Sequence, residues 1–199
     1  MSFIMTADRL ASQIQFILEA DRLKDVQRRS YVISGGRREN SAEHSWHIAL
    51  MSMVLAEYAN AAIDTLKVIR MLIVHDLVEI DADDTFIYDA AGNETKAERE
   101  RLAADRIFGL LPQDQGSQMR VLWEEFESRA TSEARFAAAL DRMMPVLHNL
   151  HNNGRSWTEH GVTSTQVFAR NAGIAEGSQE LWDYLKSELN AAIRNGVLR

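Results

Sequence analysis

Apolar side chains recur at intervals of three and four residues along most of the chain, and few residues interrupt the pattern. The 199 residues include only two prolines and ten glycines. This spacing places apolar side chains on one face of an α-helix. No stretch shows the convincing apolar–polar alternation that would indicate a strand. The sequence therefore predicts an all-α fold, with helices over about 6–24, 41–59, 64–80, 95–111, 117–129 and 132–149, and one or two more before the C-terminus.

Polar residues mark where some of these helices begin. Asn40 or Ser41 can cap the second helix, and Ser178 can cap the last. Within the third helix, residues 68–74 are apolar almost all round, which is typical of a helix buried on every side. No repeat, low-complexity tract or linker divides the chain, so we expect a single domain over residues 1–199.

Composition narrows the classes of function. The chain has no cysteine, which excludes a cysteine nucleophile and thiolate metal ligands and fits a reducing compartment. A formal net charge of −7 disfavours non-specific binding to nucleic acid. No apolar run approaches the roughly 18 residues that a membrane span requires, and the N-terminus lacks a basic region followed by an apolar one. We expect a cytoplasmic protein without a nucleic-acid or membrane partner.

One segment opposes the negative charge of the chain. Residues 22–38 contain a single acid, Asp25, and six cations: Arg22, Lys24, Arg28, Arg29, Arg37 and Arg38. Residues 25–40 break the helical spacing and contain Gly35-Gly36, which indicates a loop. A local positive surplus is suited to a small anionic substrate, because a basic patch can act against the global charge. A solvated charged loop is the alternative for any single arginine.

The dipeptide His75-Asp76 ends the most apolar segment of the chain. A histidine and an acid beside a buried helix need a reason, since unpaired buried charge is costly, and coordination of a divalent metal is one such reason. Neighbouring residues on a helix diverge by about 100°, so other helices must supply the remaining ligands. His44, in the first turn of the second helix, and Asp141, on an otherwise apolar helix face, are the candidates.

Two further acids accompany this group. Glu79 follows His75 by four residues and shares its helix face, and Asp84 lies just beyond the helix end. Each is placed to contact a metal-bound water or the substrate. Alternatives stay open for the separate pieces: His44 as a hydrogen-bonded histidine, Asp141 as the partner of a nearby arginine, and the acids as a solvated helix end.

The remaining histidines are weaker candidates as ligands. His47 lies three residues after His44, where a place in the core or a contact with a metal ligand is favoured over direct ligation. His148, His151 and His160 lie at or beyond a helix end, where surface or loop-bracing roles are favoured.

The ordered set of His44, His75-Asp76 and Asp141 resembles the HD-domain superfamily of metal phosphohydrolases. Within it, the chain is similar to the 5′-deoxynucleotidase branch, on the stretches RENSAEHS (38–45) and HDLVE (75–79) and the acid at Asp84. The resemblance covers about residues 23–149. It implies a single-domain HD-type helical bundle, with a metal-site core over about 23–150 and a C-terminal helical extension over about 154–199.

The resemblance also implies an activity and roles for residues. The branch forms homodimers that remove phosphate from deoxyribonucleoside 5′-monophosphates. One divalent ion is then expected on His44, His75, Asp76 and Asp141, with Glu79 and Asp84 assisting catalysis. The ion is Mn, Co, Fe or Zn in preference to Mg, because the ligands mix imidazole and carboxylate.

Substrate binding is expected to fall to arginines. Guanidinium groups bind phosphate oxygens in pairs, and Arg28 and Arg38 are the expected clamps. The family places an aromatic residue after the first of these arginines, whereas Arg28 is followed by Arg29, with Tyr31 two positions further on. This departure bears on the choice of sugar and base.

Three other interpretations remain. The first is a hydrolase of the same superfamily acting on a nucleoside triphosphate, a cyclic nucleotide or a guanosine alarmone. The second is a di-iron oxygenase, which would need histidines such as His47, His148 or His151 at the metal. The third is a metal-stabilised binding module without turnover, although the presence of Glu79 and Asp84 beside the ligands disfavours it.

Overall fold

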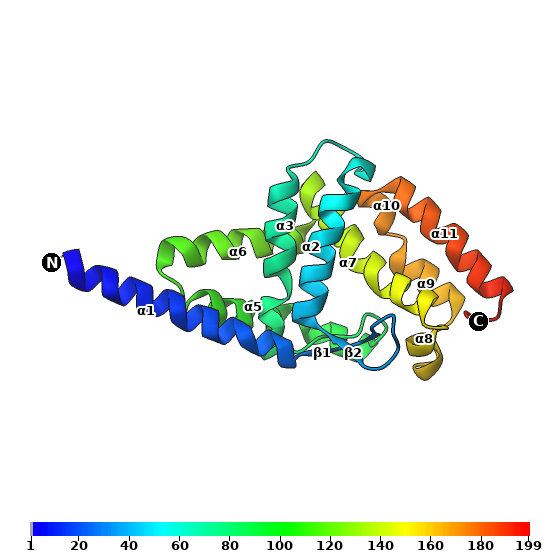
Figure 1. Ribbon diagram of the computed structural model, residues 1–199, viewed down its shortest axis with the longest axis horizontal. Coiled ribbons are helices and arrows are strands. Elements are labelled where there is room, and N and C mark those ends of the chain that lie inside the picture. Colours follow the sequence, from blue (N-terminus) through cyan, green and yellow to red (C-terminus); the bar gives the residue numbers. More distant parts are fainter. Residues whose placement is uncertain (1) are drawn as a thin grey trace.

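The computed structural model describes residues 2–199, and the side chains among them other than those of residues 2–7, 90, 91 and 93. Helices dominate (Figure 1), and the all-α prediction is confirmed. In chain order the elements are α1 (Ser2–Ala20), η1 (Asp21–Asp25), β1 (Gln27–Tyr31), β2 (Arg38–Asn40), α2 (Ser41–Leu55), η2 (Ala56–Tyr58), α3 (Thr65–Val74), η3 (His75–Val78), α4 (Glu79–Ala82), α5 (Ala90–Phe108), α6 (Gln113–Ser128), α7 (Ser132–His151), α8 (Arg155–Glu159), α9 (Ser164–Asn171), α10 (Ile174–Gly177) and α11 (Gln179–Arg194).

Two short strands replace the loop that the sequence predicted. β1 and β2 pair antiparallel, with Gln27 opposite Asn40 and Tyr31 opposite Arg38, and the register is irregular between these pairs. The prediction was wrong because β1 reads QRRSY and has no apolar alternation to reveal it. Polar contacts hold the strand instead, among them the Tyr31 hydroxyl, which donates to Glu159 at 2.9 Å.

Asn40 joins this hairpin to α2 through a capping box. Its side chain accepts from the backbone N–H of Glu43 at 2.9 Å, and the Glu43 carboxylate accepts in return from the Asn40 backbone N–H at 3.4 Å. Reciprocal bonds of this kind satisfy donors that the first helical turn leaves without partners. They fix the start of α2, and with it His44 in the first turn of that helix.

The helix predicted over residues 64–80 is divided in the structure. α3 ends at Val74, a 3₁₀ turn (η3) follows, and α4 completes the segment. A 3₁₀ stretch inside a helix has three residues per turn and often marks a functional position. The prediction of burial on every side was also wrong: Met71 and Leu72 are fully buried, but Ile73 is 52% exposed, so α3 is amphipathic.

Two clusters of buried apolar side chains meet around η3. The larger cluster joins α2 and α3 to α7 and to the C-terminal helices, and the smaller one joins η3 and α4 to α5 and α6. α7 lies at the centre, with Phe136, Leu140 and Met144 almost completely buried. A side chain at Gly177 would clash with the backbone carbonyl of Arg135, which shows how closely α10 packs on α7. The metal-ligand candidates therefore stand on packed helices rather than on free loops.

None of the helices in the described part of the chain is long and apolar enough to cross a lipid bilayer.

Candidate metal centre

Three helical segments bring His44, His75 and Asp141 together. His44 comes from α2, His75 from η3 and Asp141 from α7. The Oδ1 atom of Asp141 lies 3.0 Å from Nε2 of His44 and 3.8 Å from Nε2 of His75. One ligand atom from each residue lies within 4.8 Å of the other two. An ion bound at about 2.0–2.2 Å from each atom requires only small shifts of these side chains.

Asp76 completes the set that the sequence singled out. Its Oδ1 atom lies 2.9 Å from Nε2 of His75, and its side chain is almost buried. His75 and Asp76 are adjacent residues at the start of η3, and both are buried there. The four predicted ligands thus surround one buried space.

The orientation of His75 fits a metal ligand. Its Nδ1 atom lies 2.9 Å from the carbonyl oxygen of Leu72, which suits Nδ1–H as the donor. Nε2 then faces Asp76 and Asp141, and although both carboxylates are near, this buried atom makes no hydrogen bond of acceptable geometry. In the neutral ring, the form that binds a metal, Nε2 is the nitrogen that carries no proton. Metal-binding histidines commonly donate their second N–H to a carbonyl in this way. The orphaned nitrogen and the mixed imidazole and carboxylate donors fit a divalent transition metal.

Burial and neighbouring charges shift the pKa values of the residues in this cluster. Burial opposes ionisation of Asp141, but the hydrogen bond from His44 and the charge of the nearby His75 imidazole bring its pKa well below the usual value. Burial likewise opposes a charge on His75, but the carboxylates of Asp76 and Asp141 raise its pKa well above the usual value. Protons on the imidazoles therefore take the place that a cation would occupy.

Arg28 lies inside this group of acids. Its Nη1 atom is 3.0 Å from Oδ2 of Asp76 and 3.7 Å from Oδ1 of Asp84, and its Nη2 atom is 3.8 Å from Oδ1 of Asp141. Burial works against its charge, but the carboxylates of Asp84 and Asp76 raise its pKa further above the ordinary range. β1 thus delivers a guanidinium directly to the metal-ligand candidates.

Arg38 lies apart from this group. Its guanidinium is 3.6 Å from Glu159 and stacks 5.6 Å from the ring centre of Tyr31. It lines a second cavity, whose lining shares Asp84 and Arg29 with that of the cavity at the metal-ligand candidates. The structure therefore brings Arg28 to the ligands but not Arg38.

Glu79 and Asp84 flank the ligands as acids with unusual protonation. Glu79 is 5% exposed and accepts a 2.6 Å hydrogen bond from the Ser41 hydroxyl. Burial, together with the charges of Asp76 and Asp84, raises the pKa of Glu79 well above its usual value. Burial also raises the pKa of Asp84, against the opposing charge of Arg28. Both shifts favour the protonated form of these acids.

A cavity of about 660 Å³ opens in front of the ligands. This volume is in the range of small-molecule sites. Aromatic side chains of Phe86, Tyr88 and Trp157 line it, together with the cations Lys96 and Arg170. No sequence motif indicated these residues, because they come from α5, α8, α9 and the segment before α5.

Glu39 is a residue at the site to which the sequence analysis assigned no role. It is 2% exposed, and its Oε2 atom lies 3.4 Å from Nδ1 of His44 and 3.8 Å from Nε of Arg28. The hydroxyl of Ser30 donates to the same oxygen at 3.2 Å. Glu39 is therefore placed to orient His44 from behind, as carboxylates commonly do for metal-binding histidines.

His148 corrects one prediction from the sequence. It lies in the last turn of α7, where a surface or loop-bracing role was predicted, but it is 2% exposed. Its Nδ1 atom lies 3.7 Å from Oε2 of Glu39. Glu39 of β2 lies beside it from a distant part of the chain, so the local sequence does not reveal this burial.

The chain is similar in sequence to a protein family and to two named enzymes. A family model for the HD domain matches residues 20–182. The 5′-deoxynucleotidase HDDC2 of Homo sapiens is 31% identical over 137 residues, which are 68% of this chain and 66% of that protein. The 5′-deoxynucleotidase hdd1 of Schizosaccharomyces pombe is 24% identical over 69% of this chain and 71% of its own length. The chain thus spans about two thirds of the length of these relatives.

Solved structures are also similar to this chain. The crystal structure of a predicted metal-dependent phosphohydrolase from Magnetospirillum magnetotacticum is 50% identical, covers 96% of each chain and superposes with a TM-score of 0.92. A conserved hypothetical protein from Pyrococcus furiosus, 23% identical over 91% of this chain and 99% of its own, has a TM-score of 0.62 and shows the same fold. The family match extends over most of the sequence, and the resemblance seen in the motifs is confirmed: the chain belongs to the HD-domain family.

Proposed function

We propose that this protein is a metal-dependent phosphohydrolase that converts (deoxy)ribonucleoside 5′-monophosphates to nucleoside and phosphate. The observation that carries the proposal is the buried meeting of His44, His75, Asp76 and Asp141 next to Arg28, with Nε2 of His75 left without a hydrogen bond. Relatives named as 5′-deoxynucleotidases support the choice of substrate.

One divalent ion, held by the four ligands, is part of the proposal. Mn, Co, Fe and Zn suit imidazole and carboxylate ligands better than Mg does. When bound, such an ion polarises the phosphoryl group and lowers the pKa of a coordinated water. Burial of His44 and His75 keeps competing water away from the imidazoles, and the Leu72 carbonyl holds the His75 ring in place.

Side chains around the ion bind the phosphate, donate a proton and orient the attacking water. Arg28 binds the phosphate oxygens in a bidentate manner, exchanging its contacts with Asp76 and Asp84 for the substrate. Glu79, whose raised pKa favours the protonated carboxyl, donates its proton to the leaving sugar oxygen. Asp84 orients the attacking water. Arg38, held by Glu159 outside this group, contributes at most to the approach of the anion.

A homodimer is the proposed state of the protein in solution. One face of α2 carries Trp46, Leu50 and Met53 at four- and three-residue spacing, and all three are exposed. Exposed apolar side chains gathered along one helix face are typical of a protein–protein contact. We choose a second copy of the chain as the protein that covers this face, because a homodimer requires no other protein. We place the protein in the cytoplasm, where a chain without cysteine fits the reducing conditions.

A phosphate-release screen tests the proposed reaction. Purified protein is stripped of metal and supplied in turn with Mn²⁺, Co²⁺, Fe²⁺, Zn²⁺ and Mg²⁺. Each form is tested on deoxyribonucleoside and ribonucleoside monophosphates, a nucleoside triphosphate, a cyclic nucleotide and a guanosine alarmone. Orthophosphate and nucleoside from monophosphates are expected. Release of tripolyphosphate or pyrophosphate would instead assign the chain to another hydrolase class, and binding without release would make it a binding module.

A further inference from the structure

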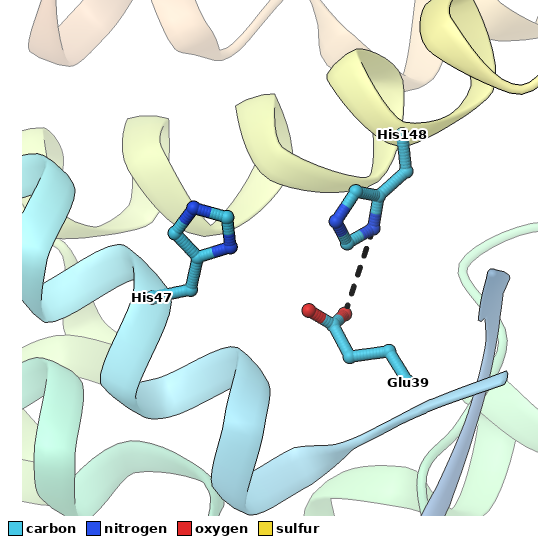
Figure 2. Close-up of side chains that lie close together, drawn as sticks. All are labelled: Glu39, His47 and His148. Atoms are coloured by element: carbon cyan, nitrogen blue, oxygen red, sulfur yellow. Dashed lines mark ion pairs between the residues drawn. The ribbon is translucent and has the colours of Figure 1, made fainter. Parts of the chain in front are cut away.

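A second group of metal-ligating side chains lies behind His44. Glu39 from β2, His47 from α2 and His148 from α7 each offer one ligand atom, and these atoms lie within 4.8 Å of one another. Figure 2 shows the two imidazole rings and the carboxylate pointing into one common space. None of the three belongs to the first group, which uses His44, His75, Asp76 and Asp141.

His148 provides the observation that hydrogen bonding does not explain. It is 2% exposed, and its Nδ1 atom makes no hydrogen bond although the Glu39 carboxylate lies 3.7 Å away (Figure 2). A buried polar atom without a partner costs about 1–3 kcal/mol. A cation between the ring and the carboxylate would remove that cost. Burial lowers the pKa of His148, which keeps the imidazole neutral, the form that binds metals.

His47 differs from Glu39 and His148 because it is only partly buried. It lies one turn after His44 on α2, and its ring centre is 6.3 Å from that of His148. Two imidazoles and one carboxylate are a known ligand set for zinc and leave a fourth position for water. The partly open side at His47 provides a path for the ion and its water.

We propose that Glu39, His47 and His148 bind a second divalent transition-metal ion, of which Zn²⁺ is the best match. This site is separate from the centre that holds the reacting phosphate. The two are linked by Glu39, whose Oε2 atom also lies 3.4 Å from Nδ1 of His44. Occupation of the second site fixes the carboxylate that faces His44, so the ion acts on the position of that ring.

Metal counting tests the proposal without reference to catalysis. Full-length protein is stripped with a chelator, dialysed against Zn²⁺ alone, and its bound metal is measured by elemental analysis. We expect His47→Ala to bind one ion fewer than the natural protein, and the double variant His47→Ala/His75→Ala to bind two fewer. His151→Ala, which changes an exposed histidine at the end of α7, is the matched control and should bind as many ions as the natural protein.

Anomalous diffraction from Zn²⁺-soaked crystals provides the second measurement. A peak within about 2.0–2.3 Å of all three side chains supports the proposal, and its absence overturns it. An unchanged metal content in His47→Ala also overturns it. If His47→Ala were to unfold, the conservative His47→Gln takes its place in both measurements. The readout is bound metal, so failure here leaves the proposed reaction standing, and failure of phosphate release leaves this site standing.

Discussion

Oδ1 of Asp141 lies 3.0 Å from Nε2 of His44, although 97 residues separate them in the chain. His75 reaches the same carboxylate oxygen at 3.8 Å from a third segment. A carboxylate that meets two buried imidazoles is suited to a cation, because its buried negative charge needs a positive partner and the imidazole nitrogens are metal ligands.

Loss of His75 should remove both metal and activity. His75→Ala deletes the nitrogen that has no hydrogen bond and leaves Asp76 and Asp141 without their shared neighbour. We expect the variant to lose tightly bound metal on dialysis and to release no phosphate above background, with little change in helical content by circular dichroism. Full activity with metal retained would contradict the assignment of this centre.

Arg28 should govern substrate binding more than Arg38 does. Arg28→Ala removes the guanidinium that lies 3.0 Å from Asp76, and we expect the Michaelis constant for a nucleoside monophosphate to rise at least tenfold, or about 1.4 kcal/mol. Arg38→Ala is the matched control, since Arg38 pairs with Glu159 away from the ligands. Equal effects of the two changes, or an unchanged constant in Arg28→Ala, would exclude Arg28 as the phosphate clamp.

Glu79 should act on the chemical step and not on metal binding. Glu79→Gln keeps the shape and the bond from Ser41 but removes the transferable proton, so kcat should fall about 10²- to 10⁴-fold while bound metal stays the same. Asp81→Asn changes a neighbouring acid that pairs with Arg106 at the surface and should leave kcat unchanged. A kcat for Glu79→Gln within a factor of two of the natural enzyme would rule out proton donation by this residue.

Local sequence was sufficient for much of the fold, and it singled out the candidate metal ligands. Periodic apolar residues and the caps at Asn40 and Ser178 gave the helices, since both depend on neighbours within one turn. The ligands His44, His75-Asp76 and Asp141 stood out because each is a charged or polar group in an apolar setting. Their convergence matches what the resemblance implied.

Long-range packing determined what the sequence analysis missed. β1 has no apolar alternation and depends on contacts with distant residues, so it was read as a loop. Glu39 precedes a helix cap, where an acid is usually solvated, but it is buried beside His44 of α2 and His148 of α7. His148 is buried for the same reason. Burial of a polar residue by a segment 100 residues away leaves no local signature.

Metal should stabilise the protein more as pH rises. In the metal-free protein, burial opposes a charge on His75, but the carboxylates of Asp76 and Asp141 raise its pKa above the ordinary value of 6.5. Burial and the charges of Asp76 and Asp84 raise the pKa of Glu79 above its ordinary value of 4.5. The folded state therefore holds protons that the unfolded state has released, so stability falls as pH increases through and above 6.5. A bound cation replaces those protons.

Thermal unfolding at several pH values checks this. The Tm of the metal-free protein should fall between pH 6 and pH 8, and the gain in Tm on adding Zn²⁺ or Co²⁺ should grow over that interval. The lowered pKa values of Asp76 and Asp141 work in the opposite direction only below their ordinary value of 3.8, outside the interval. A metal-free Tm that rises from pH 6 to pH 8 would contradict the expected protonation of the cluster.

Charge placed on the exposed face of α2 should separate the proposed homodimer. Leu50 and Met53 are 43% and 65% exposed, and glutamate at both positions would bring like charges together if this face meets its copy. We expect light scattering to give twice the chain mass of 22.5 kDa for the natural protein and the single mass for Leu50→Glu/Met53→Glu. Val121→Glu, at an equally exposed apolar position on α6, should remain dimeric. A natural protein with the mass of a single chain would refute the dimer. A double variant that stays dimeric would show that the interface lies on another face, and the exposed apolar side of α1 would then be tested next.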